Sequence, residues 1–433
     1  MAPLSLTLFL FFSASLAAEG DSAARSSAEW SYWRGPGARG ISSARHLPER
    51  WSAPSNQAEK KSENIAWMVD LPGWGNSSPV LSADRVYVTS QTADNGLHLV
   101  AVDRDRGTIV WDQKLGSGKL KAHELHNMAT PTPAVAGERV WALFGTGDLY
   151  CVDRDGKVLW QRDLQKDEGK YKILWGMGSS PILHGDRLFL ACMHPGRSYV
   201  AAFDKATGTK AWSTLRNLPC VGEATDSYSS PALLEAGGRV ELIVAGADHI
   251  DAYDPASGKQ VWVSSGLKID HPYGRTISSP GVGDGFVVAC SASVQGLGKA
   301  VAVRAGGSGD VTASHRLWQY DKFTPDCPTP LCHGGEVYLV KDDGIASCLD
   351  AKTGKLHWKK RLVERDFKAS PVFADGKVYF LSMDGDCIVL KAGPEYREIA
   401  VNKLEGTFIA TPAFADGRIY FRAKSRVYAV GAQ

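Results

Sequence analysis

The sequence predicts an all-β protein, an eight-bladed β-propeller of four-stranded antiparallel blades that is closed by an N-terminal strand. Three patterns in the 433 residues support this prediction: a repeated hairpin, a regular series of prolines, and two terminal fragments that complement each other. A repeat of roughly 40 to 50 residues that consists only of short strands is typical of a propeller.

The hairpin repeat is clearest at 202–212, which reads Ala-Phe-Asp-Lys-Ala-Thr-Gly-Thr-Lys-Ala-Trp. Similar phrases occupy 101–111, 252–262 and 348–358, and a copy one residue shorter occupies 151–160. In each copy we expect a strand to end at an Asp that bonds its own backbone in a turn. A Gly then takes positive φ, and a returning strand ends on Trp.

A Ser/Thr-Pro step followed by apolar residues precedes each hairpin. These steps recur every 41 to 54 residues, at Pro79, Pro133, Pro181, Pro231, Pro280, Pro330, Pro371 and Pro412. Eight steps of this length predict eight blades, which form a single domain from 64 to 433 because the blades share one ring.

The two ends of this domain are each an incomplete blade. Residues 64–71 read as an outermost strand without three preceding strands, and 411–430 read as three strands without a fourth. We therefore expect the N-terminal strand to complete the last blade, which would remove two exposed sheet edges. Two blades depart from the pattern: the fifth has Arg304 and an insertion at 305–314, and the seventh, 388–404, has no Trp. We expect these to be weak points of the ring.

The N-terminal 63 residues contain two further segments. Residues 1–18 hold an apolar run with small residues at its end and are expected to be a signal peptide, so we expect export to the periplasm or the extracellular space. Residues 19–63 are an extended segment with a Trp-Arg-Gly-Pro motif at 33–36, which is either a linker or a strap on the propeller, and we favour the strap. Trp33 and Trp51 are its expected anchors, and Trp30 is expected to contribute almost nothing.

Charge and cysteine content narrow the function classes. With 49 basic and 47 acidic residues the net charge is +2, and no basic run marks a nucleic-acid or membrane surface. No membrane insertion is expected, and we expect a monomer. Four of the eight cysteines, Cys151, Cys192, Cys290 and Cys348, fall in core positions of the repeat. Cys327 and Cys332 form the best disulfide candidate.

The hairpin phrase Ala-x-Asp-x-x-Thr-Gly-Lys-x-x-Trp resembles the tryptophan-docking repeat of the pyrroloquinoline-quinone (PQQ) propeller superfamily. The copy at 348–358 departs from it only at its first position. The resemblance implies that seven tryptophans pack between neighbouring blades: Trp67, Trp111, Trp160, Trp212, Trp262, Trp318 and Trp358. The Trp-Arg-Gly-Pro motif is similar to the start of secreted PQQ-like proteins of planctomycete type. The superfamily includes quinoprotein dehydrogenases and non-catalytic scaffolds, among them the propeller lipoprotein of the β-barrel assembly machinery.

Residues that lie just before each Ser/Thr-Pro step are expected to surround the axis on one face. The candidate ligand-binding residues are Trp74, His123, His126, Asn127, Trp175, Glu223, Asp226, Tyr228, Arg275 and Lys368. This set is polar, aromatic and mixed in charge, which suits a small polar ligand, a glycan or a partner's loop. Instead of binding a ligand, each charged member could be a solvated loop residue. Trp74 and Trp175 could instead pack against a neighbouring loop.

Several chemistries are less well supported. His123 and His126 offer a metal only two ligands, so no metal site is predicted. The resemblance implies that a PQQ site needs two adjacent cysteines and a Glu, Asn and Asp set for calcium. No two cysteines are adjacent, and no motif places Glu223, Asn127 and Asp226 in those roles. The sequence therefore favours an exported, non-catalytic binding platform without a cofactor. The alternatives are a PQQ-dependent dehydrogenase and a polysaccharide-active enzyme with a site at the propeller mouth.

Overall fold

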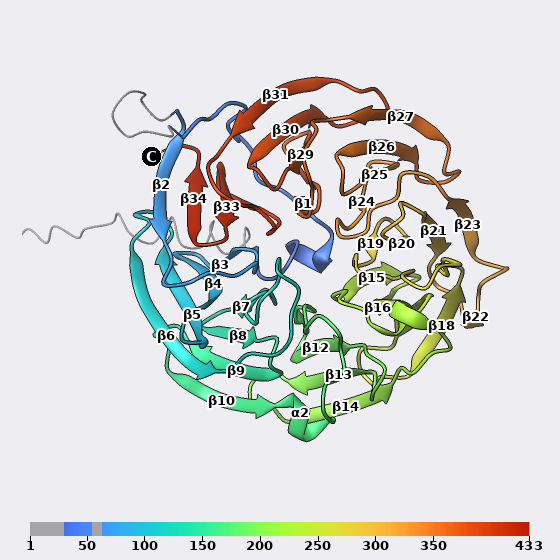
Figure 1. Cartoon of the computed structure of the whole chain (residues 1–433), viewed down its shortest axis with the longest axis horizontal. Coiled ribbons are helices and arrows are strands. Elements are labelled where there is room, and N and C mark those ends of the chain that lie inside the picture. Colours follow the sequence, from blue (N-terminus) through green and yellow to red (C-terminus); the bar gives the residue numbers. More distant parts are fainter. Residues whose placement is uncertain (1–29, 54–62, 433) are drawn as a thin grey trace, which may run out of the picture.

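The computed structural model describes residues 30–53 and 63–432 and confirms the eight-bladed propeller. Eight antiparallel sheets stand in a ring around one axis, and the chain passes from each blade to its neighbour (Figure 1). Within a blade the first strand lies at the axis and the fourth at the rim. The buried apolar side chains lie in the spaces between successive sheets.

Each blade has four strands, numbered along the chain. In blades 1 to 4 they are β3 (Val80–Leu81), β4 (Arg85–Gln91), β5 (Gly96–Asp103), β6 (Ile109–Ser117); β7 (Ala134–Ala136), β8 (Arg139–Leu143), β9 (Asp148–Asp153), β10 (Val158–Asp163); β11 (Ile182–His184), β12 (Arg187–Cys192), β13 (Tyr199–Asp204), β14 (Lys210–Leu215); and β15 (Ala232–Ala236), β16 (Arg239–Gly246), β17 (His249–Tyr253), β18 (Gln260–Ser265).

In blades 5 to 8 the strands are β19 (Gly281–Val282), β20 (Phe286–Ala292), β21 (Gly298–Arg304), β23 (Arg316–Tyr320); β24 (Leu331–His333), β25 (Glu336–Val340), β26 (Ile345–Asp350), β27 (Leu356–Arg361); β28 (Val372–Ala374), β29 (Lys377–Leu381), β30 (Asp386–Lys391), β31 (Glu398–Lys403); and β32 (Ala413–Ala415), β33 (Arg418–Ala423), β34 (Arg426–Val430), β2 (Ile65–Asp70).

The ring closes as the sequence predicted. Strand β2 pairs antiparallel with β34, with Met68 opposite Tyr428 and Val69 opposite Val427. The blue strand β2 therefore lies beside the red strands of blade 8 in Figure 1. An edge that would otherwise expose unpaired backbone groups of β34 is thereby covered.

The hairpin repeat sets the contact between blades. In blade 3 the carboxylate of Asp204 accepts a 2.8 Å hydrogen bond from the backbone N–H of Thr207, which fixes the predicted turn. The Trp212 indole N–H donates to the Pro255 carbonyl of blade 4 at 3.0 Å. A Cβ at Gly258 of that blade would lie 2.5 Å from the Trp212 ring, and Gly258 has φ of 72°. Glycine is therefore required there both for conformation and for close approach.

The insertion in blade 5 was expected to weaken the ring, but in the structure it adds a contact. Its residues form β22 (Gly309–Asp310), which pairs in parallel with β18 of blade 4. Gly309 lies opposite Trp262, and that tryptophan is buried. The insertion thus gives blade 4 a fifth strand and connects two blades at the rim.

The missing tryptophan of blade 7 is replaced from outside the repeat. Ala400 occupies the paired position that Trp holds in the other blades, opposite Val389. Trp51 from the N-terminal segment lies beside it, where its backbone N–H donates to Asn402 Oδ1 at 3.0 Å. Its ring centroid is 5.6 Å from that of Phe421 in blade 8. An indole therefore fills the space between blades 7 and 8.

Residues 30–53, the described part of the N-terminal segment, lie on the propeller and are called the strap below. The strap contains η2 (Pro36–Ala38) and β1 (Ile41–Ser42), which pairs in parallel with β28. The prediction that Trp30 contributes almost nothing is wrong, because Trp30 is only 1% exposed and its carbonyl accepts a hydrogen bond from Leu81. Sequence composition alone did not reveal a strap that is itself part of the core.

The predicted signal peptide at 1–18 lies outside the described residues. Among the residues that are described, no helix is long and apolar enough to cross a membrane.

Candidate functional site

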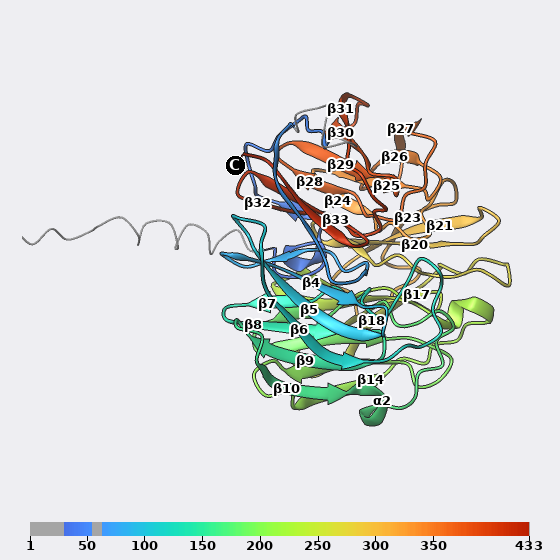
Figure 2. The same cartoon turned by 60° about the vertical axis from the view of Figure 1, so that its left-hand side comes forward.

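A cavity of about 1040 Å³ lies on the propeller axis. Its wall includes side chains from the loops that lead into the first strands, as the sequence predicted for the central face. The strap lies at the other end of these strands, because its backbone bonds to Leu81, Val135 and Phe373 within them. Figure 2 shows the blue strap and the yellow-green helix η3 (Gly222–Thr225) of the mouth on opposite sides of the ring.

The strap closes the inner end of the cavity. Trp33 lines it, and the adjacent Arg34 is fully buried. The Arg34 guanidinium donates to the carbonyl oxygens of Thr329 and Pro330 at 3.1 and 3.2 Å. Burial lowers the pKa of Arg34 to about 9. Its guanidinium also lies 5.8 Å from the ring centroid of Trp33. The axial channel is therefore a pocket that opens at one face.

Eight hydroxyl residues surround the axis at the level of the Ser/Thr-Pro steps, and a series of seven hydrogen bonds connects them from Ser78 to Thr411. In seven steps the backbone N–H of one blade donates to the hydroxyl oxygen of the next, over 2.7–3.1 Å. The members are Ser78, Thr132, Ser180, Ser230, Ser279, Thr329, Ser370 and Thr411, all of which line the cavity. The sequence predicted the Ser/Thr-Pro steps but not these hydrogen bonds between them. The bonds give a reason for a hydroxyl residue before the proline, because that hydroxyl accepts from the preceding blade.

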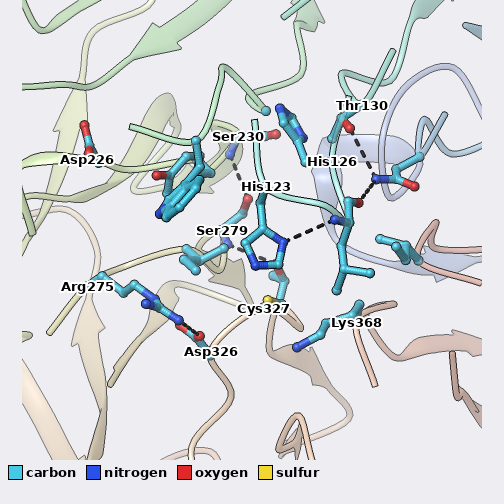
Figure 3. Close-up of a pocket in the computed structure, with 18 of the residues that line it drawn as sticks. His123, His126, Thr130, Asp226, Ser230, Arg275, Ser279, Asp326, Cys327 and Lys368 are labelled. Atoms are coloured by element: carbon cyan, nitrogen blue, oxygen red, sulfur yellow. Dashed lines mark hydrogen bonds and ion pairs between the residues drawn. The ribbon is translucent and has the colours of Figure 1, made fainter. Parts of the chain in front are cut away.

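One wall of the cavity is charged, and its charges are paired. Arg275 bonds Asp326 Oδ2 at 2.6 Å (Figure 3). Arg275 also bonds Glu223 Oε2 at 3.0 Å, and Lys368 bonds Asp342 Oδ1 at 2.8 Å. Burial alone lowers the pKa of Arg275, but its bonds to Asp326 and Glu223 outweigh that effect and raise it. The cations are thus held as components of the wall rather than left free.

The opposite wall is aromatic. The ring of His123 meets that of Trp175 edge to face, with centroids 5.6 Å apart and an interplanar angle of 83°. The ammonium of Lys121 lies 4.8 Å from the Trp175 ring centroid, within the range of a cation–π contact. Both His123 and Trp175 line the cavity, so this part of its wall is aromatic.

Five cavity residues have a buried polar atom without a partner among the described residues: Asn76 Oδ1, Ser78 Oγ, His126 Nε2, Asp226 Oδ1 and Tyr228 OH. Burial lowers the pKa of His126 to about 4 and raises that of Asp226 to about 6. Burial, together with the charges of Asp226 and Glu223, raises the pKa of Tyr228, and this effect outweighs the opposite effects of Arg275 and of the nearby Trp175 backbone N–H. At neutral pH the histidine and the phenol are therefore uncharged.

Eight of the ten predicted ligand residues line this cavity, and two do not. Trp74 forms an isolated bridge with Gln91, and Lys424 lies over its ring at 4.9 Å. Asn127 donates from Nδ2 to the Trp74 carbonyl at 2.8 Å and accepts from the backbone N–H of Ala129 at 3.0 Å. The prediction that Trp74 and Asn127 line the central site is therefore corrected: both fasten the loops of blades 1 and 2.

The predicted disulfide is also absent. All eight cysteines are free thiols. Cys332 is buried in the core of blades 5 and 6, whereas Cys327 borders the cavity near Asp326. The two residues are close in sequence but face different environments. Sequence reasoning also did not find Trp33 and Cys327 as cavity residues, because neither belongs to the repeated pattern.

A family model described as outer membrane protein assembly factor BamB matches residues 57–219, 175–317 and 307–393. Together these overlapping matches cover well over half of the chain. The chain belongs to this family of PQQ-like propellers.

Two solved propeller structures are similar to this BamB-like chain. BamB from Moraxella catarrhalis has a TM-score of 0.60 at 14% identity, over 85% of this chain and 97% of that one. The quinohemoprotein alcohol dehydrogenase of Comamonas testosteroni has a TM-score of 0.66 at 12% identity, over 95% and 82%. At these identities the likeness shows the fold alone.

One curated relative is similar in sequence. Quinohemoprotein alcohol dehydrogenase ADH IIB of Pseudomonas putida is 26% identical over 300 residues, which make up 65% of this chain. The chain matches only 42% of the length of that enzyme.

The residues of this BamB-like chain do not fit a calcium–quinone site of the type predicted from the superfamily. Glu223 is paired with Arg275, and both ends of the Asn127 amide are held by backbone groups, so neither is free to bind calcium. No adjacent cysteines are present in the sequence to stack on a quinone. Asp226 keeps one free oxygen, but a single carboxylate does not make a calcium site.

One cluster in the described ranges has three groups that could bind a metal: Asp326, Cys327 and Asp342, whose ligand atoms lie within 4.8 Å of one another. It does not include His123 or His126. Arg275 and Lys368 already compensate the two carboxylates, so a metal ion would have to displace cations that the structure holds in place.

Proposed function

We propose that this chain is an exported, non-catalytic binding platform whose axial cavity holds a small polar ligand. The observation that carries the proposal is the cavity itself, which is closed at one end by Trp33 and lined by an aromatic wall and a wall of paired charges. Cavities of this size with a few convergent polar groups are typical ligand sites.

The mouth is built as a rigid rim. Ser227 bridges Met193 on one side and Thr276 on the other, and Arg275 bridges Ala292. The Ser227 hydroxyl donates to the Thr276 carbonyl at 2.9 Å. Such bonds between mouth segments of neighbouring blades fix the site before a ligand arrives, which reduces the entropy lost on binding.

The mouth also exposes apolar side chains. Val221, Val294 and Tyr273 are 72%, 63% and 56% exposed on the loops of blades 3 to 5, and the last two also line the cavity. Apolar groups gathered around a cavity favour contact with a ligand or partner that extends beyond it. Export of the protein rests on the predicted signal peptide and agrees with the outer-membrane role named for the family.

The second candidate function is that of a quinoprotein dehydrogenase. It is favoured by the 26% identity to the Pseudomonas putida enzyme. The engaged side chains of Glu223 and Asn127 argue against it.

The test compares two tryptophans on the same face of the protein. A library of small polar compounds is screened by the rise in melting temperature of the purified wild-type protein, Trp175→Ala and Trp74→Ala. Compounds that stabilise the wild type should lose their effect with Trp175→Ala, which removes part of the cavity wall. They should keep it with Trp74→Ala, because Trp74 lies outside the cavity. Equal effects of every compound on all three proteins would show that the cavity is not the binding site.

A further inference from the structure

His126, Asp226 and Tyr228 all line the cavity. A Cβ at Gly178 would lie 3.7 Å from both His126 Cε1 and Tyr228 Cβ, so these two side chains flank the same glycine. Ser227 lies between Asp226 and Tyr228 in the sequence. Its hydroxyl points away from the cavity and donates to the carbonyl oxygens of Ala245 and Thr276. In an extended segment residues two apart point to the same side, so Asp226 and Tyr228 both point to the cavity.

Buried polar atoms are nearly always hydrogen-bonded to protein, ligand or water, so the unpartnered atoms of the cavity wall are the groups that a ligand can bond. Asp226 Oδ2 already accepts from the Leu174 backbone N–H at 3.3 Å, and its Oδ1 needs a second donor. The Tyr228 hydroxyl both donates and accepts, and the ring nitrogen of a neutral histidine does one or the other. A ligand hydroxyl matches this mixture because it donates and accepts at once.

The charges around the cavity disfavour a charged ligand. A cation would find Glu223 and Asp326 already paired with Arg275. An anion would find Arg275 paired with these two carboxylates and Lys368 paired with Asp342. Because these charges compensate one another, an uncharged ligand is favoured.

From these observations, and resting on the proposed function, we propose that the ligand is an uncharged saccharide. Its hydroxyls bond Asp226, Tyr228 and His126, and its C–H face packs on the aromatic wall at Trp175. An amphipathic ring surface of this kind, flat and apolar with polar groups at the edge, is what Trp and Tyr side chains contact well. The cavity of about 1040 Å³ has room for more than one sugar ring.

The first experiment is calorimetric titration of the purified protein with disaccharides of similar size and different charge. Cellobiose, maltose and lactose are uncharged, digalacturonic acid is an anion, and the dimer of glucosamine is a cation. We expect at least one uncharged disaccharide to bind, at least tenfold more tightly than either charged one. Tighter binding of a charged disaccharide would overturn the proposal. So would the absence of binding by all three uncharged ones, which would mean that water satisfies these atoms.

The second experiment uses matched tyrosine variants with the disaccharide that binds. Tyr228→Phe should weaken it about five- to tenfold, as expected for one lost hydrogen bond. Tyr379→Phe is the control, because it removes another buried, unpartnered hydroxyl in the core of blade 7 that does not line the cavity. Unchanged affinity in Tyr228→Phe would contradict the proposal. Asp226→Asn provides a second variant should Tyr228→Phe fold poorly, and its affinity should fall as well.

The two proposals fail in different ways. Binding of a non-saccharide that depends on Trp175, together with no binding of disaccharides, would refute the saccharide and leave the binding function standing. Binding that is independent of Trp175 for every compound would refute the function itself.

Discussion

At the scale of single residues, the tryptophans differ in how deeply they are buried. The composition around Trp30 predicts an extended segment with little core of its own. The Trp30 side chain is nevertheless only 1% exposed, and its ring centroid lies 6.0 Å from that of Phe414. Trp212 belongs to the repeat but is only half-buried. The repeat predicts where an indole lies between blades, but it does not predict how much of that indole is covered.

This comparison gives a prediction for stability. Trp30→Ala should lower the free energy of unfolding by about 3–5 kcal/mol, the range for a fully buried large aromatic side chain. The loss should equal or exceed that of Trp212→Ala. Urea denaturation of both variants measures it. An unchanged unfolding midpoint for Trp30→Ala would show that the strap does not contribute to the core.

A second residue-scale prediction concerns the Asp226 carboxyl. Burial raises its pKa from 3.8 to about 6, so the folded state holds this proton more tightly than the unfolded state does. Ionisation of Asp226 therefore costs stability, and the cost grows as the pH rises through this window. Asp226→Asn should gain stability relative to the wild type between about pH 4 and about pH 7.

The control for this prediction has the opposite sign. Hydrogen bonds from Thr207 lower the pKa of Asp204, so this carboxylate stabilises the fold above its unfolded pKa, and the contribution is lost as the pH falls. Asp204→Asn should be less stable than the wild type at neutral pH and should approach it in acid. Melting temperatures measured across pH check both variants, and parallel curves for Asp226→Asn and the wild type would contradict the assignment.

At the scale of elements, regular features were predictable and exceptions were not. The Ser/Thr-Pro steps and the Asp-Gly-Trp hairpins gave the blades, their order and the pairing of β2 with β34, because each repeat carries its own turn chemistry. The contacts of β22 and Trp51 could not be predicted, because each packs on a blade to which it does not itself belong. A local pattern carries no information on such contacts.

Strand β2 gives the prediction at this scale. Deletion of 64–71 should expose the edge of β34 and lower the stability of the whole ring, because a propeller unfolds as a cooperative unit when its closure is lost. Calorimetry should show a lower and broader transition, and gel filtration should show association. Met68→Ala is the control, because Met68 is 45% exposed and the strand remains. A monomeric deletion variant that melts within a few degrees of the wild type would refute the closure.

At the scale of the whole molecule, the sequence predicted where the cavity lies, but it predicted only part of the residues that line it. The loops before the first strands converge on the axis in any propeller, so eight of the ten candidate residues were found from spacing alone. Trp74 and Asn127 were misplaced because sequence does not show which way a loop residue points. The closure of the cavity by Trp33 depends on the path of the strap, which no repeat encodes.

The central claim is that this cavity binds a ligand without oxidising it, and reconstitution with a quinone tests it most directly. The purified protein is incubated with PQQ and Ca²⁺, passed through gel filtration, and assayed by absorbance and by dye-linked oxidation of alcohols and sugars. We expect no retained quinone and no dye reduction, because Glu223 and Asn127 are engaged elsewhere. A retained quinone with dye reduction that is lost in Trp175→Ala would contradict the claim and make the protein a quinoprotein dehydrogenase.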